Sequence, residues 1–162
     1  MAVRIGMTSP TSMTVNDRIY QDGRLVLAGG LILKNNSLLL LRRRGSFYET
    51  PGGKVQPGDC VDSASPTIAD FANGAVRELG EELGAEVVFG RAEYVMHVKF
   101  SLPNGLPAVA YKFTVPIITG VPRIAEPETF DSLEYVFIRD LARHNLSPDL
   151  KLLSSTIEAR FS

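Results

Sequence analysis

A glutamate-rich segment carries the residue types and spacing that best suit chemistry; it reads Arg77-Glu78-Leu79-Gly80-Glu81-Glu82-Leu83-Gly84. Positions i, i+3 and i+4 of a helix share one side, so Glu78, Glu81 and Glu82 are expected to lie within reach of one another. Three carboxylates that close repel, and a divalent cation relieves the repulsion. Hard oxygen ligands in this number suit Mg²⁺ or Mn²⁺. The alternative is a solvated acidic face, the usual fate of a run of charges.

A helix over 66–83 is predicted to carry these glutamates. Ser65-Pro66 is typical of an N-cap followed by proline at the first helical position, and Gly84 is a typical C-terminal stop. The apolar stripe of this helix comprises Ala72, Val76, Leu79 and Leu83. Because the acidic residues lie beside that stripe, we expect one face of the helix to pack on a sheet and another to border a cleft.

Five other stretches are predicted to be strands. They are apolar or alternating, they are bounded by turn residues, and they cover 25–33, 37–42, 87–102, 107–118 and 133–138. The repeated leucines of the second stretch indicate a strand buried on both faces. Pro103-Asn104-Gly105 predicts a hairpin between the third stretch and the fourth.

A second helix is predicted to start at Ser147-Pro148, with Leu150, Leu153 and Ile157 on one face. Several strands with two helices predict an α/β (α+β) fold in which a mixed β-sheet is sandwiched between helices. Residues 1–16 are interpreted as a flexible leader or edge element, and 17–162 as a single domain.

Composition sets broad limits on function. The chain has 162 residues, a net charge of −1 and 44% hydrophobic residues, as expected for a globular domain with no electrostatic preference for nucleic acid or membranes. Its single cysteine, Cys60, excludes an intrachain disulfide and fits a reducing compartment. The longest apolar stretch, 25–33, is too short to cross a bilayer. We therefore expect a cytoplasmic protein.

The glutamate segment and the residues before it resemble the signature of the Nudix hydrolases, GX5EX7REUXEEXGU, where U is a bulky aliphatic residue. Gly53 and Asp59 match the first part, and the segment from Arg77 to Ala85 matches the second. The stretch Tyr48-Glu49-Thr50-Pro51-Gly52-Gly53 is also similar to the aromatic-x-x-Pro-Gly-Gly approach of that family. The resemblance implies the Nudix fold and a MutT-like nucleotide diphosphatase.

Three departures from the signature stand out. Asp59 replaces a glutamate, Ala85 replaces a bulky aliphatic residue, and seventeen residues rather than seven separate Asp59 from Arg77. The ten extra residues are expected to form a longer loop or to extend the helix. In the second case Asp70 could take the place of the missing glutamate, although Gly58-Asp59 matches the position of the family's glutamate better.

The resemblance also implies roles for residues. Glu78 and Glu82 are expected to bind Mg²⁺ or Mn²⁺ directly, with Glu81 as a further ligand or as the holder of a metal-bound water. The Gly53 carbonyl is expected to add a ligand, since glycine lets the backbone approach the ion closely. Arg77 is expected to orient the carboxylates by ion pairing.

Substrate-binding residues are expected around the second strand. One of the arginines at 42–44 is expected to bind a terminal phosphate, with Arg42 and Arg44 as the candidates, and Tyr48 to stack on a base or to pack in the core. The candidates for a general base are Glu82, Glu78 and a carboxylate of the loop at 126–131, although that loop could also be a solvated acidic loop. The loop offers Glu126, Glu128 and Asp131, of which Glu128 is the first choice.

The function implied is metal-dependent hydrolysis of a diphosphate, either in a nucleoside diphosphate linked to another group, such as ADP-ribose or a nucleotide sugar, or in a nucleoside triphosphate. A nucleoside monophosphate would be released. The alternative is a non-catalytic Nudix-fold sensor that binds a nucleotide. The expected partner is a small nucleotide rather than nucleic acid or membrane. A homodimer is open, with the strand at 107–118 as a candidate edge.

Overall fold

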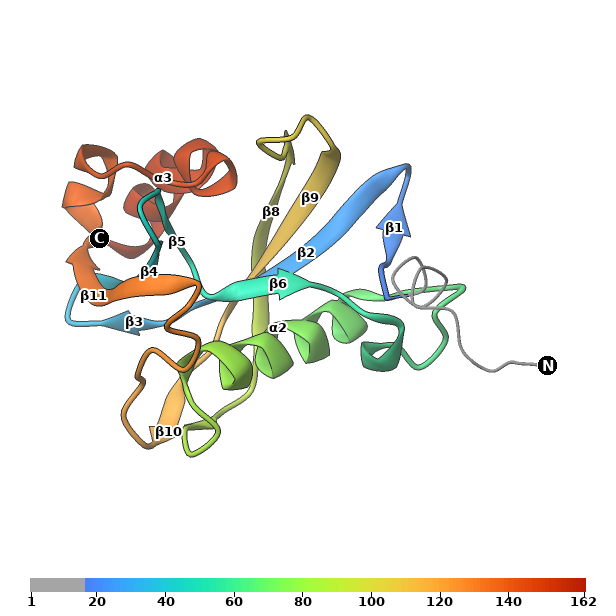
Figure 1. Cartoon of the computed structure of the whole chain (residues 1–162), viewed down its shortest axis with the longest axis horizontal. Coiled ribbons are helices and arrows are strands. Elements are labelled where there is room, and N and C mark those ends of the chain that lie inside the picture. Colours follow the sequence, from blue (N-terminus) through green and yellow to red (C-terminus); the bar gives the residue numbers. More distant parts are fainter. Residues whose placement is uncertain (1–16) are drawn as a thin grey trace.

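The framework of the protein is a curled set of β-sheets (Figure 1). The structure is a computed structural model that describes residues 17–162. The predicted leader, 1–16, lies outside the described residues. The largest sheet has the order β1–β2–β9–β8, and β6 also pairs with β2. Its strands are β1 (Tyr20–Gln21), β2 (Arg24–Leu31), β6 (Gly52–Lys54), β8 (Glu93–Ser101) and β9 (Pro107–Thr114). Only the β2–β9 pair is parallel, so this sheet is mixed.

Two smaller sheets complete the strands. One has the order β11–β4–β3 with β5 also on β4, and the other pairs β10 with β7. Their strands are β3 (Leu33–Lys34), β4 (Ser37–Arg43), β5 (Tyr48–Glu49), β7 (Val88–Phe89), β10 (Ile117–Thr119) and β11 (Phe130–Phe137). The helical elements are η1 (Pro57–Asp59), α2 (Ile68–Leu83), η2 (Ile138–Arg143) and α3 (Pro148–Phe161).

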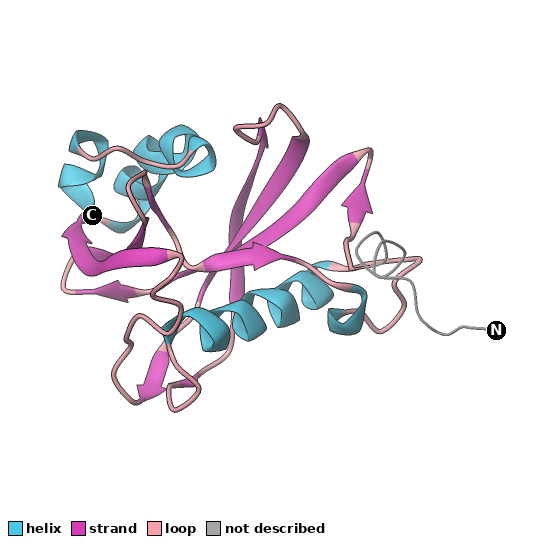
Figure 2. Ribbon diagram, viewed as in Figure 1, coloured by secondary structure: helices cyan, strands magenta, loops and turns pink. Residues whose placement is uncertain are grey.

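The two long helices lie on different sides of the strands, as Figure 2 shows, and this confirms the predicted fold class. Strand β4 explains the arrangement, because all four of its leucines are fully buried. Leu39 and Leu41 belong to the core beneath α2, whereas Leu38 and Leu40 belong to the core beneath α3. Successive side chains of a strand point to opposite faces, so one leucine run supplies both cores. The predicted burial on both faces is confirmed.

Helix α2 begins later than predicted. Thr67, rather than Ser65, is its N-cap: the Thr67 hydroxyl accepts a hydrogen bond from the Asp70 amide, and the Asp70 carboxylate accepts one from the Thr67 amide. This reciprocal capping box satisfies two backbone donors that would otherwise be free, and it leaves Pro66 before the helix. Its buried face also differs slightly from the predicted stripe, since Phe71 and Ala75, with Leu79 and Leu83, form it.

The capping box also settles the position of Asp70. Its buried carboxylate accepts hydrogen bonds from the amides of Thr67 and Val61, at the start of the helix. Asp70 therefore does not stand in for the missing glutamate. Between Asp59 and Arg77, residues 60–67 form a loop and residues 68–76 belong to α2. The ten extra residues therefore contribute both to a longer loop and to a longer helix, the two possibilities that the sequence left open.

The hairpin around Pro103-Asn104-Gly105 and the helix after Ser147 form as predicted, and Leu150, Leu153 and Ile157 are buried. Over 107–114, the candidate dimer strand is not an edge of the sheet. Strand β9 lies between β2 and β8 and bonds to both, so its backbone is not free to pair with a second chain.

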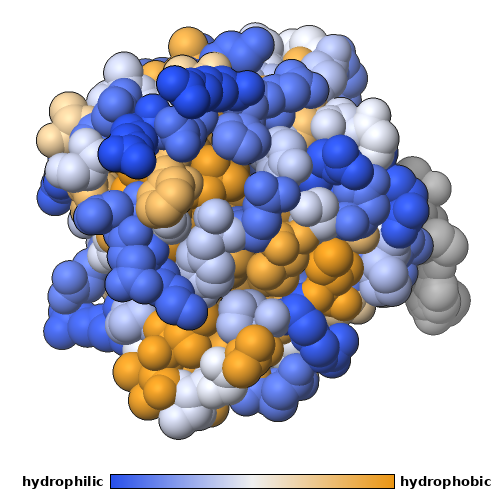
Figure 3. Space-filling model, turned by 90° about the vertical axis from the view of Figure 1, so that its left-hand side faces the viewer, coloured by the Kyte–Doolittle hydropathy of each residue, from blue (hydrophilic) through white to orange (hydrophobic). Residues whose placement is uncertain are grey.

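Apolar side chains gather on the surface near β7 and β10, toward the lower end of the face seen in Figure 3. Val88, Ile118 and Val121 are exposed there. Among residues 17–162, no helix is long and apolar enough to cross a membrane.

Candidate active site

A cleft of about 590 Å³ opens between the two helices. Its acidic side is formed by α2 and the Pro-Gly-Gly turn, its apolar floor by β2, β8 and β9, and its far side by the start of α3. The lining includes Leu25, Leu27, Arg43, Phe47, Glu49, Thr50, Gly52, Gly53, Lys54, Glu78, Glu82, Phe100, Ala110, Lys112, Glu126, Ser147 and Asp149. A pocket of this size, with an apolar floor and several charged groups around it, can hold a small-molecule ligand.

Glu82 and Glu78 define the acidic side. Glu82 is almost fully buried, and its Oε1 accepts a hydrogen bond of 2.9 Å from the Gly52 amide. Burial, followed by repulsion from Glu78, raises the pKa of Glu82 to about 9. Burial and then Glu81 also raise the pKa of Glu78. Both shifts arise because a carboxylate taken out of water prefers to be neutral, and at Glu78 the nearby Arg77 offsets part of the shift.

Gly53 makes room for this pair. A Cβ atom at that position would lie 2.6 Å from Oε1 of Glu78, closer than such atoms approach in proteins. At the neighbouring Gly52, a Cβ would lie 2.5 Å from the Ala28 carbonyl oxygen. The two glycines therefore allow the turn to lie against β2 on one side and against the glutamate side chains on the other.

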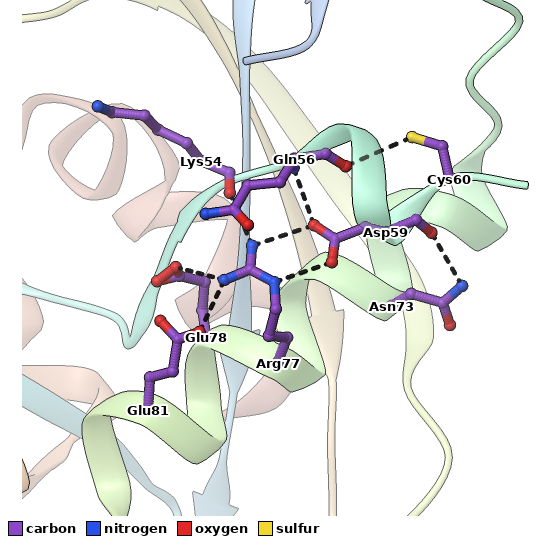
Figure 4. A network of polar contacts seen from close by, with 8 residues as sticks. All are labelled: Lys54, Gln56, Asp59, Cys60, Asn73, Arg77, Glu78 and Glu81. Atoms are coloured by element: carbon purple, nitrogen blue, oxygen red, sulfur yellow. Dashed lines mark hydrogen bonds and ion pairs between the residues drawn. The ribbon is translucent and has the colours of Figure 1, made fainter. Parts of the chain in front are cut away.

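Arg77 organises the outer part of the acidic helix (Figure 4). It donates from Nε and NH2 to the two oxygens of Asp59, at 2.8 and 3.0 Å, and from NH1 to Glu81 at 3.0 Å and to Glu78 at 3.3 Å. Its NH2 also donates to the Lys54 carbonyl. The Asp59 carboxylate is the main reason that the pKa of Arg77 lies above its ordinary value. Glu81 is half exposed and does not line the cleft.

Asp59 reaches Arg77 although its side chain is one methylene shorter than that of glutamate. The short helix η1 brings it close, and its Oδ2 also accepts a hydrogen bond from the Gln56 amide. On the facing helix, Gly74 leaves the necessary space, because a Cβ there would lie 2.9 Å from Oδ2 of Asp59. A side chain at position 74 would therefore crowd the Asp59 carboxylate that holds Arg77.

The donor set suits a divalent cation, but its side chains are not gathered around a single point. Within residues 17–162, no three His, Cys, Asp or Glu side chains form a group that could hold a metal ion as they stand. The contacts explain this, since Glu78 and Glu81 turn toward Arg77 and Glu82 turns toward Gly52. The buried carboxylate of Glu82, which has no ion-pair partner among residues 17–162, and the carboxylate of Glu78 beside Gly53 nevertheless fit a hard metal ion.

The three substrate-binding candidates do not reach the cleft. Arg42 donates to Asp131 at 2.8 Å across the β4–β11 pair, and Arg44 donates to the Pro127 carbonyl. The Tyr48 hydroxyl donates to Glu134. None of the three lines the cleft, so the structure does not bring them together with the glutamates.

Three other cations line the cleft instead: Arg43, Lys54 and Lys112. Arg43 forms a bidentate ion pair with Glu49, at 2.8 and 3.0 Å, and Lys54 is exposed directly after Gly53. Arg43 was one of three adjacent arginines in the sequence, and nothing in that run distinguished it. The strand register distinguishes Arg43 from Arg42, because successive side chains of β4 point to opposite faces.

The loop carboxylates also separate. Glu126 lines the cleft, and burial followed by repulsion from Glu81 raises its pKa. Glu128 is exposed and does not line the cleft, and Asp131 is paired with Arg42. The structure therefore brings Glu126, rather than the predicted Glu128, to the proposed site.

A buried polar group on the far side of the cleft was missed in the sequence. The Lys112 ammonium donates to the Thr50 hydroxyl at 2.7 Å and forms an ion pair with Asp149 at 2.8 Å. A signal existed, since Lys112 is the only charge in the otherwise apolar run of β9. A lone charge in a buried strand is rare unless it is paired.

Comparison with known proteins establishes the fold. No protein-family model and no curated protein matches the chain. Its structure is similar to that of a MutT Nudix hydrolase from Burkholderia pseudomallei, with a TM-score of 0.61 and 22% identity over 85% of this chain and 97% of that one. A UDP-X diphosphatase gives a TM-score of 0.63 and 18% identity, over 96% of this chain and 72% of that one.

The Nudix domain of Shewanella oneidensis NrtR, solved with ADP-ribose, gives a TM-score of 0.63 and 15% identity over 96% of this chain and 100% of that one. At such identities a structural likeness establishes the architecture rather than the activity. The expectation drawn from the glutamate segment and the Pro-Gly-Gly turn is confirmed to that extent: this chain has the Nudix fold.

Proposed function

We propose that this protein is a metal-dependent hydrolase that cleaves the diphosphate of a nucleoside diphosphate linked to another group and releases a nucleoside monophosphate. The observation that carries the proposal is Glu82, which is buried in the cleft with no ion-pair partner among residues 17–162, one helical turn from Glu78 beside Gly53. The Nudix fold supports it, because the same helix and turn carry the signature in the sequence.

In this proposal Glu78, Glu82 and the Gly53 carbonyl hold the metal, and Glu81 joins them or holds a metal-bound water. A divalent cation bound there would neutralise phosphate charge, activate water and stabilise the leaving group. Arg77 keeps Glu78 and Glu81 on one side of the helix, and Asp59 keeps Arg77 in place.

The remaining charged groups of the cleft take complementary roles. Arg43 and Lys54 face the substrate phosphates, which need cations to bind. Glu126 orients the attacking water, because the other nearby carboxylates are occupied or lie elsewhere: Glu49 is paired with Arg43, and Asp131 with Arg42. The apolar floor, which includes Leu27 and Ala110, accommodates the rest of the substrate.

A second candidate is a nucleotide sensor without catalysis. The likeness to the NrtR domain solved with ADP-ribose favours it, as does the absence of a converged ligand set in the described residues. The two candidates differ in one testable respect. A sensor binds ADP-ribose without consuming it, whereas the hydrolase consumes its substrate only when metal is present.

The experiment is a turnover assay against ADP-ribose, nucleotide sugars and nucleoside triphosphates, with and without Mg²⁺, followed by chromatography of the nucleoside monophosphate. E82Q keeps an oxygen for the Gly52 amide but removes the charge, and it should lose turnover. E93Q changes an exposed glutamate of β8 and should keep it. Full turnover by E82Q would refute the metal assignment. Binding of ADP-ribose without turnover of any compound would favour the sensor.

A further inference from the structure

Lys112 connects three elements at the far side of the cleft. It lies on β9, its partner Thr50 precedes the Pro-Gly-Gly turn, and its partner Asp149 lies in the first turn of α3. The side chains of Lys112 and Asp149 are only 5% and 14% exposed. Burial alone would raise the pKa of Asp149, but the charge and hydrogen bond of Lys112 bring it below its ordinary value. The pair is therefore ionised within a protein interior.

This ion pair is not needed to hold those elements together. The turn is already fixed on β2 by the Gly30 amide, which donates to the Pro51 carbonyl at 2.9 Å. The start of α3 is fixed on β5 by the Ser147 amide, which donates to the Tyr48 carbonyl at 2.8 Å. A buried ion pair is weak support for stability, because desolvation of two charges offsets their attraction. Contact with a ligand explains its place in the cleft better.

The group also has hydrogen-bonding capacity to spare. An ammonium has three N–H donors, and within residues 17–162 Lys112 has two protein acceptors. The Ser147 hydroxyl, which is buried and lines the same cleft, makes no hydrogen bond of normal geometry. It is close enough to Asp149 to help lower the pKa of that carboxyl. The third donor of the Lys112 ammonium, in a cleft that could hold a small molecule, therefore points to a ligand.

The surroundings indicate which ligand chemistry fits. Asp149 balances the charge of Lys112, so this end of the cleft does not attract a further phosphate. The neighbouring floor is apolar, with Leu25, Leu27 and Ala110. An uncharged group with an oxygen acceptor fits both features, since it accepts from the ammonium and rests on apolar surface. Such an oxygen can belong to a base carbonyl or to a sugar hydroxyl.

We propose that Lys112, oriented by Thr50 and Asp149, is a specificity-determining residue. Its ammonium donates a hydrogen bond to an uncharged oxygen acceptor of the substrate, either on the base or on a sugar linked to the diphosphate. The inference rests on the proposed function in one respect, because an effect on kcat/KM requires that the substrate is hydrolysed. The hydrogen bond from Lys112 does not require hydrolysis, since a nucleotide that is only bound would accept it too.

Two matched pairs of compounds test it. ITP and ATP differ by a base carbonyl in place of an amino group, and UDP-glucose and the methyl ester of UDP differ by a sugar in place of a methyl group. The ratio of kcat/KM within each pair is measured for the wild type, K112M and K112M/D149L. The double variant removes both charges, so it remains folded if K112M alone does not. K99M changes an exposed lysine of β8, away from the cleft, and serves as the control.

The wild type and K99M should prefer the acceptor-bearing member of one pair by about tenfold or more. The pair in which this occurs identifies the acceptor as base or sugar. In K112M/D149L the preference should fall close to one. If the double variant is folded and keeps the wild-type ratios, or if the wild type shows no preference in either pair, the proposal is wrong.

Failure of the proposed function gives a different result. If the wild type hydrolyses none of the four compounds, their affinities are measured by calorimetry in the same variants. The ratio of Kd within each pair of compounds then tests the role of Lys112, with the same expected outcomes as for kcat/KM.

Discussion

Asp149 and Glu82 are carboxylates of the same cleft, and their surroundings shift their pKa values in opposite directions. Asp149 is paired with Lys112 at 2.8 Å, and its pKa lies below the ordinary value. Among residues 17–162, Glu82 has only the Gly52 amide as a hydrogen-bond donor, and burial raises its pKa to about 9. Both residues were placed in the interior by the same fold, but only one was given a cation by the chain.

The difference separates two uses of a buried charge. Asp149 is complete without anything from outside, so it serves to orient another group. Glu82 lacks a counter-charge, and an external cation would supply it, as the proposed function requires. Substitutions at either carboxylate test this difference.

Removal of the negative charge from both cleft glutamates has the largest expected effect. The variant E78Q/E82Q should reduce Mg²⁺-dependent turnover by about 10³-fold or more, because the proposed ligands lose their charge. Glutamine keeps the shape of glutamate, so circular dichroism should be unchanged. Turnover within about tenfold of the wild type would show that these residues do not hold the metal.

Removal of one member of the ion pair is expected to affect stability most. K112M leaves Asp149 buried without a partner, and the free energy of unfolding should fall by about 3–5 kcal/mol. K112M/D149L removes both charges and should recover most of that loss. Urea denaturation measures both. Equal stability of the two variants would contradict the account of Asp149 as a charge that depends on Lys112.

A methyl group at Gly53 tests the space beside Glu78. The added Cβ of G53A would lie 2.6 Å from Oε1 of Glu78 and must displace that side chain. A displacement of about 1 Å can reduce turnover by about 10²-fold. Glu78 can move toward solvent, so the melting temperature should change little. G58A is a matched control, because a Cβ at Gly58 meets nothing within 4 Å.

The smallest expected effect is on the pH dependence of stability. The pKa of Asp149 is lower in the folded protein than the unfolded value of about 3.9, so its stabilising contribution is fully present above that pH. The contribution is lost as pH falls through the folded pKa. Between about pH 4 and pH 2, the wild type should therefore lose more stability than K112M/D149L. Parallel curves for the two proteins would remove the basis of the comparison.

Much of the fold could be predicted from local sequence. The leucine run at 38–41 predicted a strand buried on both faces, and Pro103-Asn104-Gly105 predicted the hairpin that forms. The start of α2 was predicted too early, at Ser65-Pro66, because a serine before a proline is a good N-cap pattern wherever it occurs. The reciprocal bonds of Thr67 and Asp70 make Thr67 the N-cap instead. The position of β9 within the sheet depends on contacts far apart in the sequence.

The cleft was only half predictable. Glu78 and Glu82 are one helical turn apart, so their proximity follows from spacing alone. Arg43, Glu126 and Lys112 come from three distant segments, and their common position depends on strand register and loop path. Spacing within a segment therefore predicted the acidic side of the cleft, whereas the cationic and neutral sides required the tertiary structure.

Direct measurement of metal binding tests the central claim most directly. Calorimetric titration of Mn²⁺ into the wild type and E82Q, each free of metal, compares the two proteins without reference to any substrate. We predict saturable binding to the wild type and at least tenfold weaker binding to E82Q, since a metal-site substitution commonly has an effect of about this size. Equal binding by both proteins would contradict the claim that Glu82 is buried without a cation in order to receive one.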